Sequence, residues 1–176
     1  MKTSLHLLKE PEFDFLTGHG REFVIAFHTA MNSLGDDHNG EIGSGYCWGK
    51  YMLIYTRQGV KSKQVYARVY LRETGPVLRL FLNDIDRHRA YLETAPEHIL
   101  EPFTNTYGAC QHCHNEKDGH CRFRKSYTLH NRLIEKCNGL TFEYPDPDPG
   151  KLDDYLDLFT EFFPPRTARK GNAKLI

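Results

Sequence analysis

Three strand-like runs separated by very short connections constrain this sequence more than any other feature. The runs cover about 48–57, 63–73 and 77–83, and they are separated by Gln58-Gly59 and by Thr74-Gly75-Pro76. Glycine and proline at these positions favour tight turns, and connections this short join antiparallel rather than parallel neighbours. The sequence therefore predicts an antiparallel meander in its first half.

Helical periodicity is found on both sides of this meander. Apolar residues at three- and four-residue spacing predict a helix over 21–34, and a cluster of glycines predicts a loop over 35–45. Residues 84–104 are predicted to be helical in two pieces, and the last helix is predicted over 152–163. Together these patterns predict an α+β fold, with an antiparallel sheet of about six strands and helices packed mainly on one face.

The other strands are expected in the second half of the chain. Strand-like segments occupy 122–129, 133–136 and 140–144. Asn138-Gly139 separates the last two segments, and this dipeptide is the most typical signal of a tight β-hairpin turn. We therefore expect the last two strands to pair with each other.

Length and charge narrow the classes of function. A chain of 176 residues fits one domain, which we place at 1–165 with a Cys/His-rich loop at 106–121, followed by a basic, mobile tail at 166–176. The 23 basic and 23 acidic residues cancel, so no overall field attracts nucleic acid. No apolar stretch approaches the roughly 20 residues of a membrane span, and no signal peptide is recognisable, so we expect a cytoplasmic protein without a membrane partner.

The sharpest local signal is a set of four cysteines in the second half. Cys110 and Cys113 are separated by two residues, a spacing that lets two thiolates bend around one tetrahedral ion. In a reducing cytosol, clustered cysteines are more often metal ligands or reactive thiols than disulfides. We therefore predict a structural zinc ion held by Cys110, Cys113, Cys121 and Cys137. Four protein ligands would leave no open position for substrate.

Other interpretations of these residues stay open. An iron–sulfur cluster could use the same four thiolates, and the run that ends at His114 also matches the attachment pattern of c-type haem. Free or redox-sensitive thiols would need no cofactor. His112, His114 or His120 could replace one cysteine ligand, and the sequence does not choose between them.

The strands around the last two cysteines provide a test of the metal interpretation. A two-residue turn at His130-Asn131 would place Cys137 opposite Arg124 and direct Cys121 to the other face, because side chains alternate along a strand. A turn one residue longer or shorter, or a bulge, would bring both sulfurs to one side. The metal interpretation therefore predicts an irregular hairpin here.

The two faces of the meander differ in composition. One parity is aliphatic, includes Met52 and Ile54, and is expected to carry the helices. The other parity interleaves tyrosine and arginine, which could stack on a small anionic or aromatic ligand. These side chains could instead simply cover the sheet with their polar tips in water. The candidate ligand-binding residues are Tyr51, Tyr55, Tyr66, Arg68, Tyr70, Arg72 and Arg79.

These observations favour a ligand-binding or regulatory module with a structural zinc site. No catalytic motif fixes a reaction, so a metal-dependent or cysteine-based enzyme is the first alternative. A nucleic-acid-binding protein is the second alternative, and it requires the tyrosine–arginine face to be open. The absence of net positive charge argues against this second alternative, because neutralising phosphates usually dominates such binding.

Overall fold

The computed structural model describes residues 8–16, 18–34, 41–57, 64–113 and 121–164. The helices within these ranges are α2 (Gly18–Ser33), α3 (Arg89–Leu92), α4 (Glu97–Thr104) and α6 (Leu152–Phe162). The strands are β1 (Glu41–Ser44), β2 (Tyr51–Arg57), β3 (Gln64–Leu71), β4 (Val77–Phe81), β5 (Arg124–Leu129), β6 (Arg132–Cys137) and β7 (Thr141–Pro145). Short 3-10 turns are η1 (Pro11–Phe13), η2 (Tyr46–Trp48), η3 (Ile85–His88) and η4 (Pro149–Lys151).

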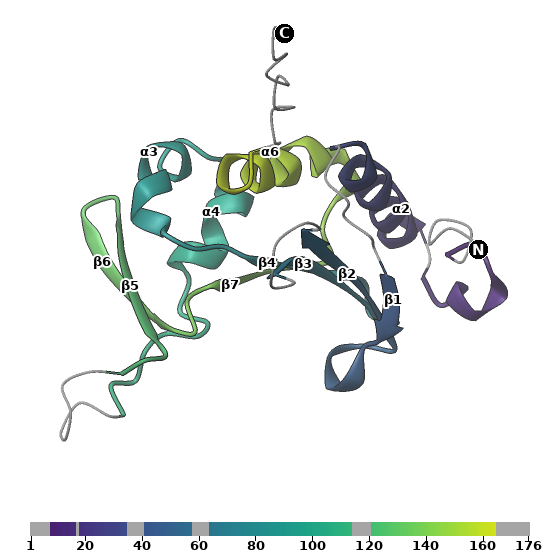
Figure 1. The fold of residues 1–176 in the computed structure, drawn as a ribbon, viewed down its shortest axis with the longest axis horizontal. Helices are drawn as coiled ribbons and strands as arrows, with labels where there is room; N and C mark the ends of the chain where they lie inside the picture. Colours follow the sequence, from purple (N-terminus) through teal and green to yellow (C-terminus); the bar gives the residue numbers. More distant parts are fainter. Residues whose placement is uncertain (1–7, 17, 35–40, 58–63, 114–120, 165–176) are drawn as a thin grey trace, which may run out of the picture.

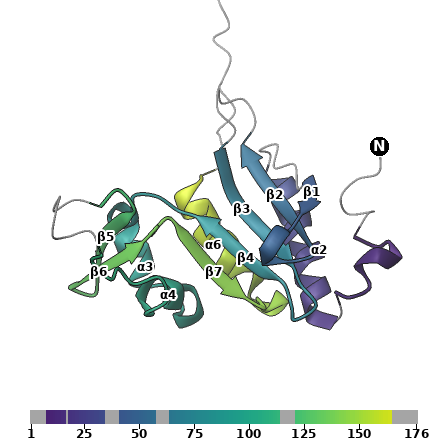
Figure 2. The same ribbon diagram turned by 90° about the horizontal axis from the view of Figure 1, so that it is seen from below.

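The strands form one antiparallel sheet and a separate hairpin, so the predicted α+β class is confirmed. The larger sheet has the order β1-β2-β3-β4-β7, and β5 pairs only with β6. Figure 1 shows α2 and α6 above the larger sheet, while the hairpin stands to one side near α3 and α4. In Figure 2 the strands cross in front of α2 and α6, which confirms that these helices cover one face.

The meander is confirmed, but one expected hairpin is not. β2, β3 and β4 pair in succession as predicted. The Asn138-Gly139 turn does not join paired strands, because β6 pairs with β5 and β7 pairs with β4. The turn instead carries the chain from one sheet to the other, where the Leu82 N–H donates to the Leu140 carbonyl at 2.7 Å. A turn is present at Asn138, but the hairpin expected there is wrong, because tertiary packing sets the strand partner.

The expected glycine-rich loop contains a short edge strand. β1 pairs with β2, with Ile42 opposite Leu53 and Gly43 opposite Met52. Residues 35–40 of the expected loop lie outside the described residues, as does the basic tail at 166–176. No described helix is long and apolar enough to cross a membrane.

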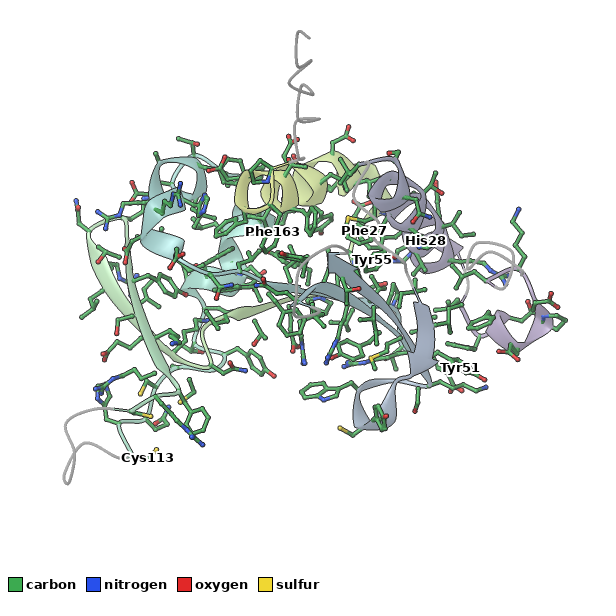
Figure 3. All side chains as sticks on the ribbon, viewed as in Figure 1. Phe27, His28, Tyr51, Tyr55, Cys113 and Phe163 are labelled. Carbon is green, nitrogen blue, oxygen red and sulfur yellow. The ribbon has the colours of Figure 1, made fainter. Side chains whose placement is uncertain are left out.

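Aromatic side chains fill the core between the sheet and the helices. Phe23 and Phe27 of α2 are fully buried, as are Phe103 of α4 and Phe159 of α6. Phe27 meets the ring of Tyr55 edge-on at a centroid distance of 5.6 Å. Such pairs stabilise by about 0.5–1.5 kcal/mol beyond the apolar area they bury. Figure 3 shows Phe27, His28 and Tyr55 together where α2 faces the sheet.

The predicted faces are right for β4 and for most of β3, and wrong for β2 and for Tyr66, which lies in the core beside a register shift. Leu53 and Tyr55 belong to the core beneath the helices, whereas Met52 packs with Tyr70 and Val77 in a small cluster on the other face. Both parities of β2 are apolar, so alternation alone could not identify its buried face. The register with β3, which places Met52 opposite Tyr70, decides it.

Candidate functional site

Backbone pairing brings two of the predicted metal ligands together. The segment just before Cys110 runs antiparallel to β6, where the Cys110 N–H donates to Glu135 O at 2.9 Å and the Cys137 N–H donates to Gly108 O at 2.8 Å. As a result, the segment that carries Cys110 lies beside the strand that ends at Cys137. Two cysteines far apart in the chain are therefore neighbours.

Backbone N–H groups also point at both sulfurs. The His112 N–H donates to Cys110 Sγ at 3.4 Å, and the Gln111 backbone N–H acts on Cys137 in the direction that lowers the pKa of its thiol. Hydrogen bonds of this kind stabilise negative charge on sulfur and are common around thiolate-bound metals. Desolvation and the nearby thiols of Cys110 and Cys113 nevertheless raise the pKa of Cys137.

The hairpin between Cys121 and Cys137 is regular, so the predicted irregularity is wrong. Leu129 lies opposite Arg132 across a two-residue turn, and Cys137 lies opposite Arg124. However, β5 begins only at Arg124, and Cys121 precedes it in a turn closed by the Arg124 N–H and the Cys121 carbonyl at 3.1 Å. Strand alternation therefore does not fix the direction of the Cys121 side chain.

The cysteines do not form a completed metal site. Among the residues that the structure describes, no group of three or more Cys, His, Asp or Glu side chains is placed to hold one ion. Cys113 is exposed, and Figure 3 shows it beyond the open end of the hairpin. His114 and His120 lie outside the described residues. His112 Nε2 lies 2.7 Å from Glu135 Oε2. The histidine is thus near the cysteines, and its partner there is a carboxylate.

Two of the predicted ligand-binding tyrosines lie in the core, and a third packs against it. Tyr55 is fully buried under α2, and Tyr66 is buried with its ring centroid 4.2 Å from that of Phe163. Tyr51 is half-buried and packs against Phe13 on the same side. These tyrosines are separated by the sheet from Arg68, Tyr70, Arg72 and Arg79, so the predicted set is divided between two faces.

On the uncovered face, Arg79 is held between two aromatic rings. Its guanidinium carbon lies 4.2 Å from the ring centroid of Trp48 and 4.9 Å from that of Tyr70. The guanidinium also donates to the Tyr70 hydroxyl at 3.0 Å and forms an ion pair with Glu143. The anticipated tyrosine–arginine stacking is therefore present at this position, and its interactions are internal to the protein.

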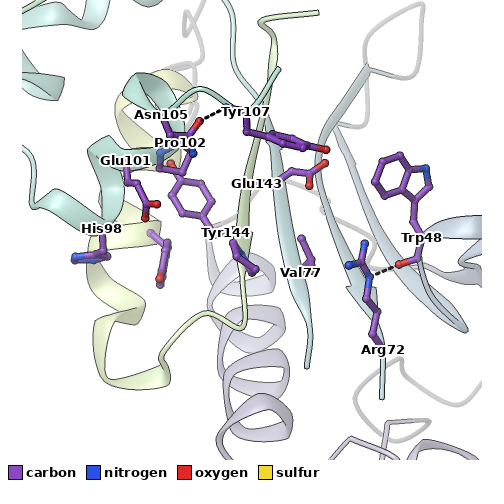
Figure 4. A pocket seen from close by; sticks show the side chains of 12 residues that line it. Trp48, Arg72, Val77, His98, Glu101, Pro102, Asn105, Tyr107, Glu143 and Tyr144 are labelled. Atoms are coloured by element: carbon purple, nitrogen blue, oxygen red, sulfur yellow. Dashed lines mark hydrogen bonds between the residues drawn. The ribbon is translucent and has the colours of Figure 1, made fainter. Parts of the chain in front are cut away.

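A pocket of about 420 Å³ opens beside this stack. It extends from Trp48 past β7 to α4, and Figure 4 shows its lining. Of the predicted ligand-binding residues, only Arg72 lines it. The other lining residues are Trp48, Val77, His98, Glu101, Pro102, Asn105, Tyr107, Glu143, Tyr144, Pro145 and Tyr155. They come from distant segments with no shared motif, so no sequence signal could have grouped them.

Comparisons with known protein families, with curated proteins and with solved structures found no match for this chain. The cysteine cluster and the pocket are therefore the two features from which a function can be inferred.

Proposed function

We propose that this chain is a ligand-binding protein whose second half is stabilised by a structural zinc ion bound to Cys110, Cys113, Cys121 and Cys137. The backbone pairing of Cys110 with Glu135 at the edge of β6 is the observation that carries the proposal, because it sets the segment of Cys110 beside the strand that ends at Cys137. Closing the site requires Cys113 and Cys121 to move toward that pair.

A metal ion at this position would stabilise the open end of the β5–β6 hairpin. A two-stranded hairpin is at best marginally stable alone, and β5 and β6 pair with no other strand of the larger sheet. Tyr127 and Leu129 bury the end of β5 near the turn, whereas Phe123 and Cys137 at the open end are exposed. A zinc ion would fix that open end and the segment around Cys113, and its binding free energy would add to folding.

The ligand-binding part of the proposal rests on the pocket. Its volume lies in the range of small-molecule sites, which are typically apolar with a few polar groups that orient the ligand. Aromatic and charged side chains line the pocket together, as in such sites. A cytoplasmic location would keep the four thiols reduced and available to zinc.

Elemental analysis of protein purified without added metal tests the zinc proposal. We expect about one zinc per chain, and we expect Cys110→Ser and Cys113→Ser to lose it together with part of the thermal stability. Cys47→Ser is the matched control, because Cys47 is an exposed cysteine outside the cluster and its loss should leave zinc content unchanged.

Two outcomes would contradict the proposed metal. Metal-free protein with unchanged stability in both cluster variants would mean that the cysteines are free thiols. Iron and sulfide in place of zinc would assign the site to an iron–sulfur cluster.

A further inference from the structure

Two uncompensated charges of opposite sign line the pocket. The Glu101 carboxylate is exposed on α4 and makes no hydrogen bond or ion pair with any residue in the described part of the chain. Arg72 donates from Nε to the Trp48 carbonyl, which leaves its positive charge without a carboxylate partner among the described residues. Figure 4 shows Glu101 and Arg72 on opposite sides of the pocket.

Two other ionisable side chains of the pocket lie close to partners. Glu143 forms an ion pair with Arg79, and His98 Nε2 lies 3.0 Å from Asp154 Oδ2. A carboxylate binds most strongly to an opposite charge that offers hydrogen-bonding geometry. Glu101 is therefore the side chain best placed to receive a positive group from a ligand.

Aromatic surface also lines the pocket, and Figure 4 shows Trp48 on the same side as Arg72. Trp48 is 39% exposed and Tyr107 is 65% exposed, although both are large side chains that usually lose much of their surface. Arg79 covers part of the Trp48 ring, and the rest remains accessible. A ligand lying between Glu101 and Arg72 would cover both rings and gain apolar burial.

We infer that this pocket binds a small zwitterion, namely a short peptide with free termini whose ammonium faces Glu101 and whose carboxylate faces Arg72. The separation of the two charges across the pocket favours a ligand with charged groups at opposite ends over an amino acid carrying both on one carbon. The apolar part of the peptide lies against Trp48 and Tyr107. This inference deepens the proposed ligand-binding function and is independent of the zinc site.

The intrinsic fluorescence of the protein can test the inference directly. Trp48 is the one tryptophan in the sequence, so its emission reports on the pocket without a label. The probes are the dipeptide Ala-Phe, its N-acetylated form and its C-terminal amide. We expect Ala-Phe to change the emission in a saturable manner, and each blocked form to bind at least about tenfold more weakly, because it lacks one of the two charged hydrogen bonds.

Two variants assign the termini of the peptide to residues. Glu101→Gln should bind Ala-Phe at least about tenfold more weakly and should no longer discriminate against the N-acetylated probe, while still discriminating against the amide. Arg72→Gln should show the reverse pattern. Glu97→Gln, one turn earlier on the same helix and outside the pocket lining, and Arg132→Gln, on β6, are matched controls that should bind like the parent.

A second variant is needed if Arg72→Gln lowers the melting temperature. Arg72→Lys retains the positive charge and should retain discrimination against the amide.

Several results would overturn the inference. Equal binding of all three dipeptides would show that neither terminus is recognised. If the amide bound as tightly as Ala-Phe, the carboxylate would not be recognised. The pocket would then be a binding site for a cation, and the inferred zwitterion would be wrong. No saturable response to any probe would refute the peptide ligand while leaving the zinc content unaffected.

Discussion

Lys136 Nζ lies 2.9 Å from Asn105 Oδ1, and the same ammonium donates to the carbonyl oxygens of Pro102 at 2.9 Å and Tyr107 at 2.8 Å. One lysine of β6 therefore holds the C-terminal end of α4 and the residues after it. Cations are favourable at a helix C-terminus, where carbonyl groups lack intrahelical partners. Burial lowers the pKa of Lys136, and its three acceptors replace the water it has lost.

Replacing this lysine should weaken the attachment of the hairpin to α4. Lys136→Met leaves three acceptors without their donor, and we expect the free energy of unfolding to fall by about 1–3 kcal/mol. Urea denaturation measures the loss. Lys125→Met is the control, because Lys125 lies opposite Lys136 on β5 and is exposed, so its replacement should stay within about 0.5 kcal/mol. Equal effects of the two variants would argue against the attachment.

The Arg79–Glu143 pair should show strong coupling. Their side chains are only 11% and 19% exposed, so removing one partner leaves a charge that is largely shielded from water. We expect Arg79→Met to cost about 3 kcal/mol, and the double variant with Glu143→Gln to lose less than the sum of the single losses. Chemical denaturation of all three variants gives the coupling energy.

A matched arginine separates this charge effect from general packing. Arg68 lies opposite Arg79 on β3, and its guanidinium carbon lies 5.3 Å from the ring centroid of Phe81. Arg68→Met should cost at most about 1 kcal/mol, the magnitude of an exposed cation–π contact. Additive losses in the Arg79 and Glu143 variants would contradict the expected coupling.

The β5–β6 turn should tolerate glycine and resist alanine. His130 and Asn131 have φ angles of +47° and +59°, the left-handed conformation required at both positions of a type I′ turn. Asn131→Ala should destabilise the protein by about 1 kcal/mol, whereas Asn131→Gly should be neutral or stabilising. Thermal melting of the two variants distinguishes them, and a stabilising alanine would contradict the turn conformation.

His28 should make stability depend on pH. Burial lowers its pKa below the ordinary value of 6.5, with Nδ1 lying 3.2 Å from the Tyr55 hydroxyl and Nε2 lying 3.1 Å from Asn32 Nδ2. Below about pH 6.5 the His28 imidazole is protonated in the unfolded chain but still neutral in the folded chain. The free energy of unfolding therefore falls as the pH drops, until the pKa of the folded state is reached. Each unit of depression contributes about 1.4 kcal/mol.

A variant isolates this contribution from the other histidines. His28→Gln lacks the titrating group, so between pH 7 and pH 5 it should lose less stability than the parent protein does. Urea midpoints measured across this range provide the comparison. Identical pH profiles for the two proteins would show that His28 does not titrate differently on folding.

The fold could be predicted where local signals agree with tertiary structure. Short turns identified β2 to β4, and the apolar stripe identified α6, because each pattern is complete within one segment. β1 was missed because Glu41–Ser44 is short and contains Gly43, so its pairing with β2 depends on context rather than propensity. The partner of β7 could not be read from the Asn138-Gly139 turn for the same reason.

The two candidate sites also differ in how far the sequence predicts them. The spacing of Cys110 and Cys113 could be seen in the sequence, and the position of Cys137 opposite Arg124 followed from counting across a two-residue turn. Glu101 and Trp48 carried no such signal. They meet at one pocket only because α4 and η2 approach the same end of the sheet.

The return of the chain from β6 to the edge of β4 has a consequence for the order of folding. The successive pairs from β1 to β4 need only short loops to close. In contrast, β7 can pair with β4 only after the long segment between them has folded back. The entropy lost in closing this long loop must be overcome before the hydrogen bonds between β4 and β7 contribute any stability. We expect the meander to form early and β7 to dock late, so damage to β4–β7 packing should mainly speed unfolding.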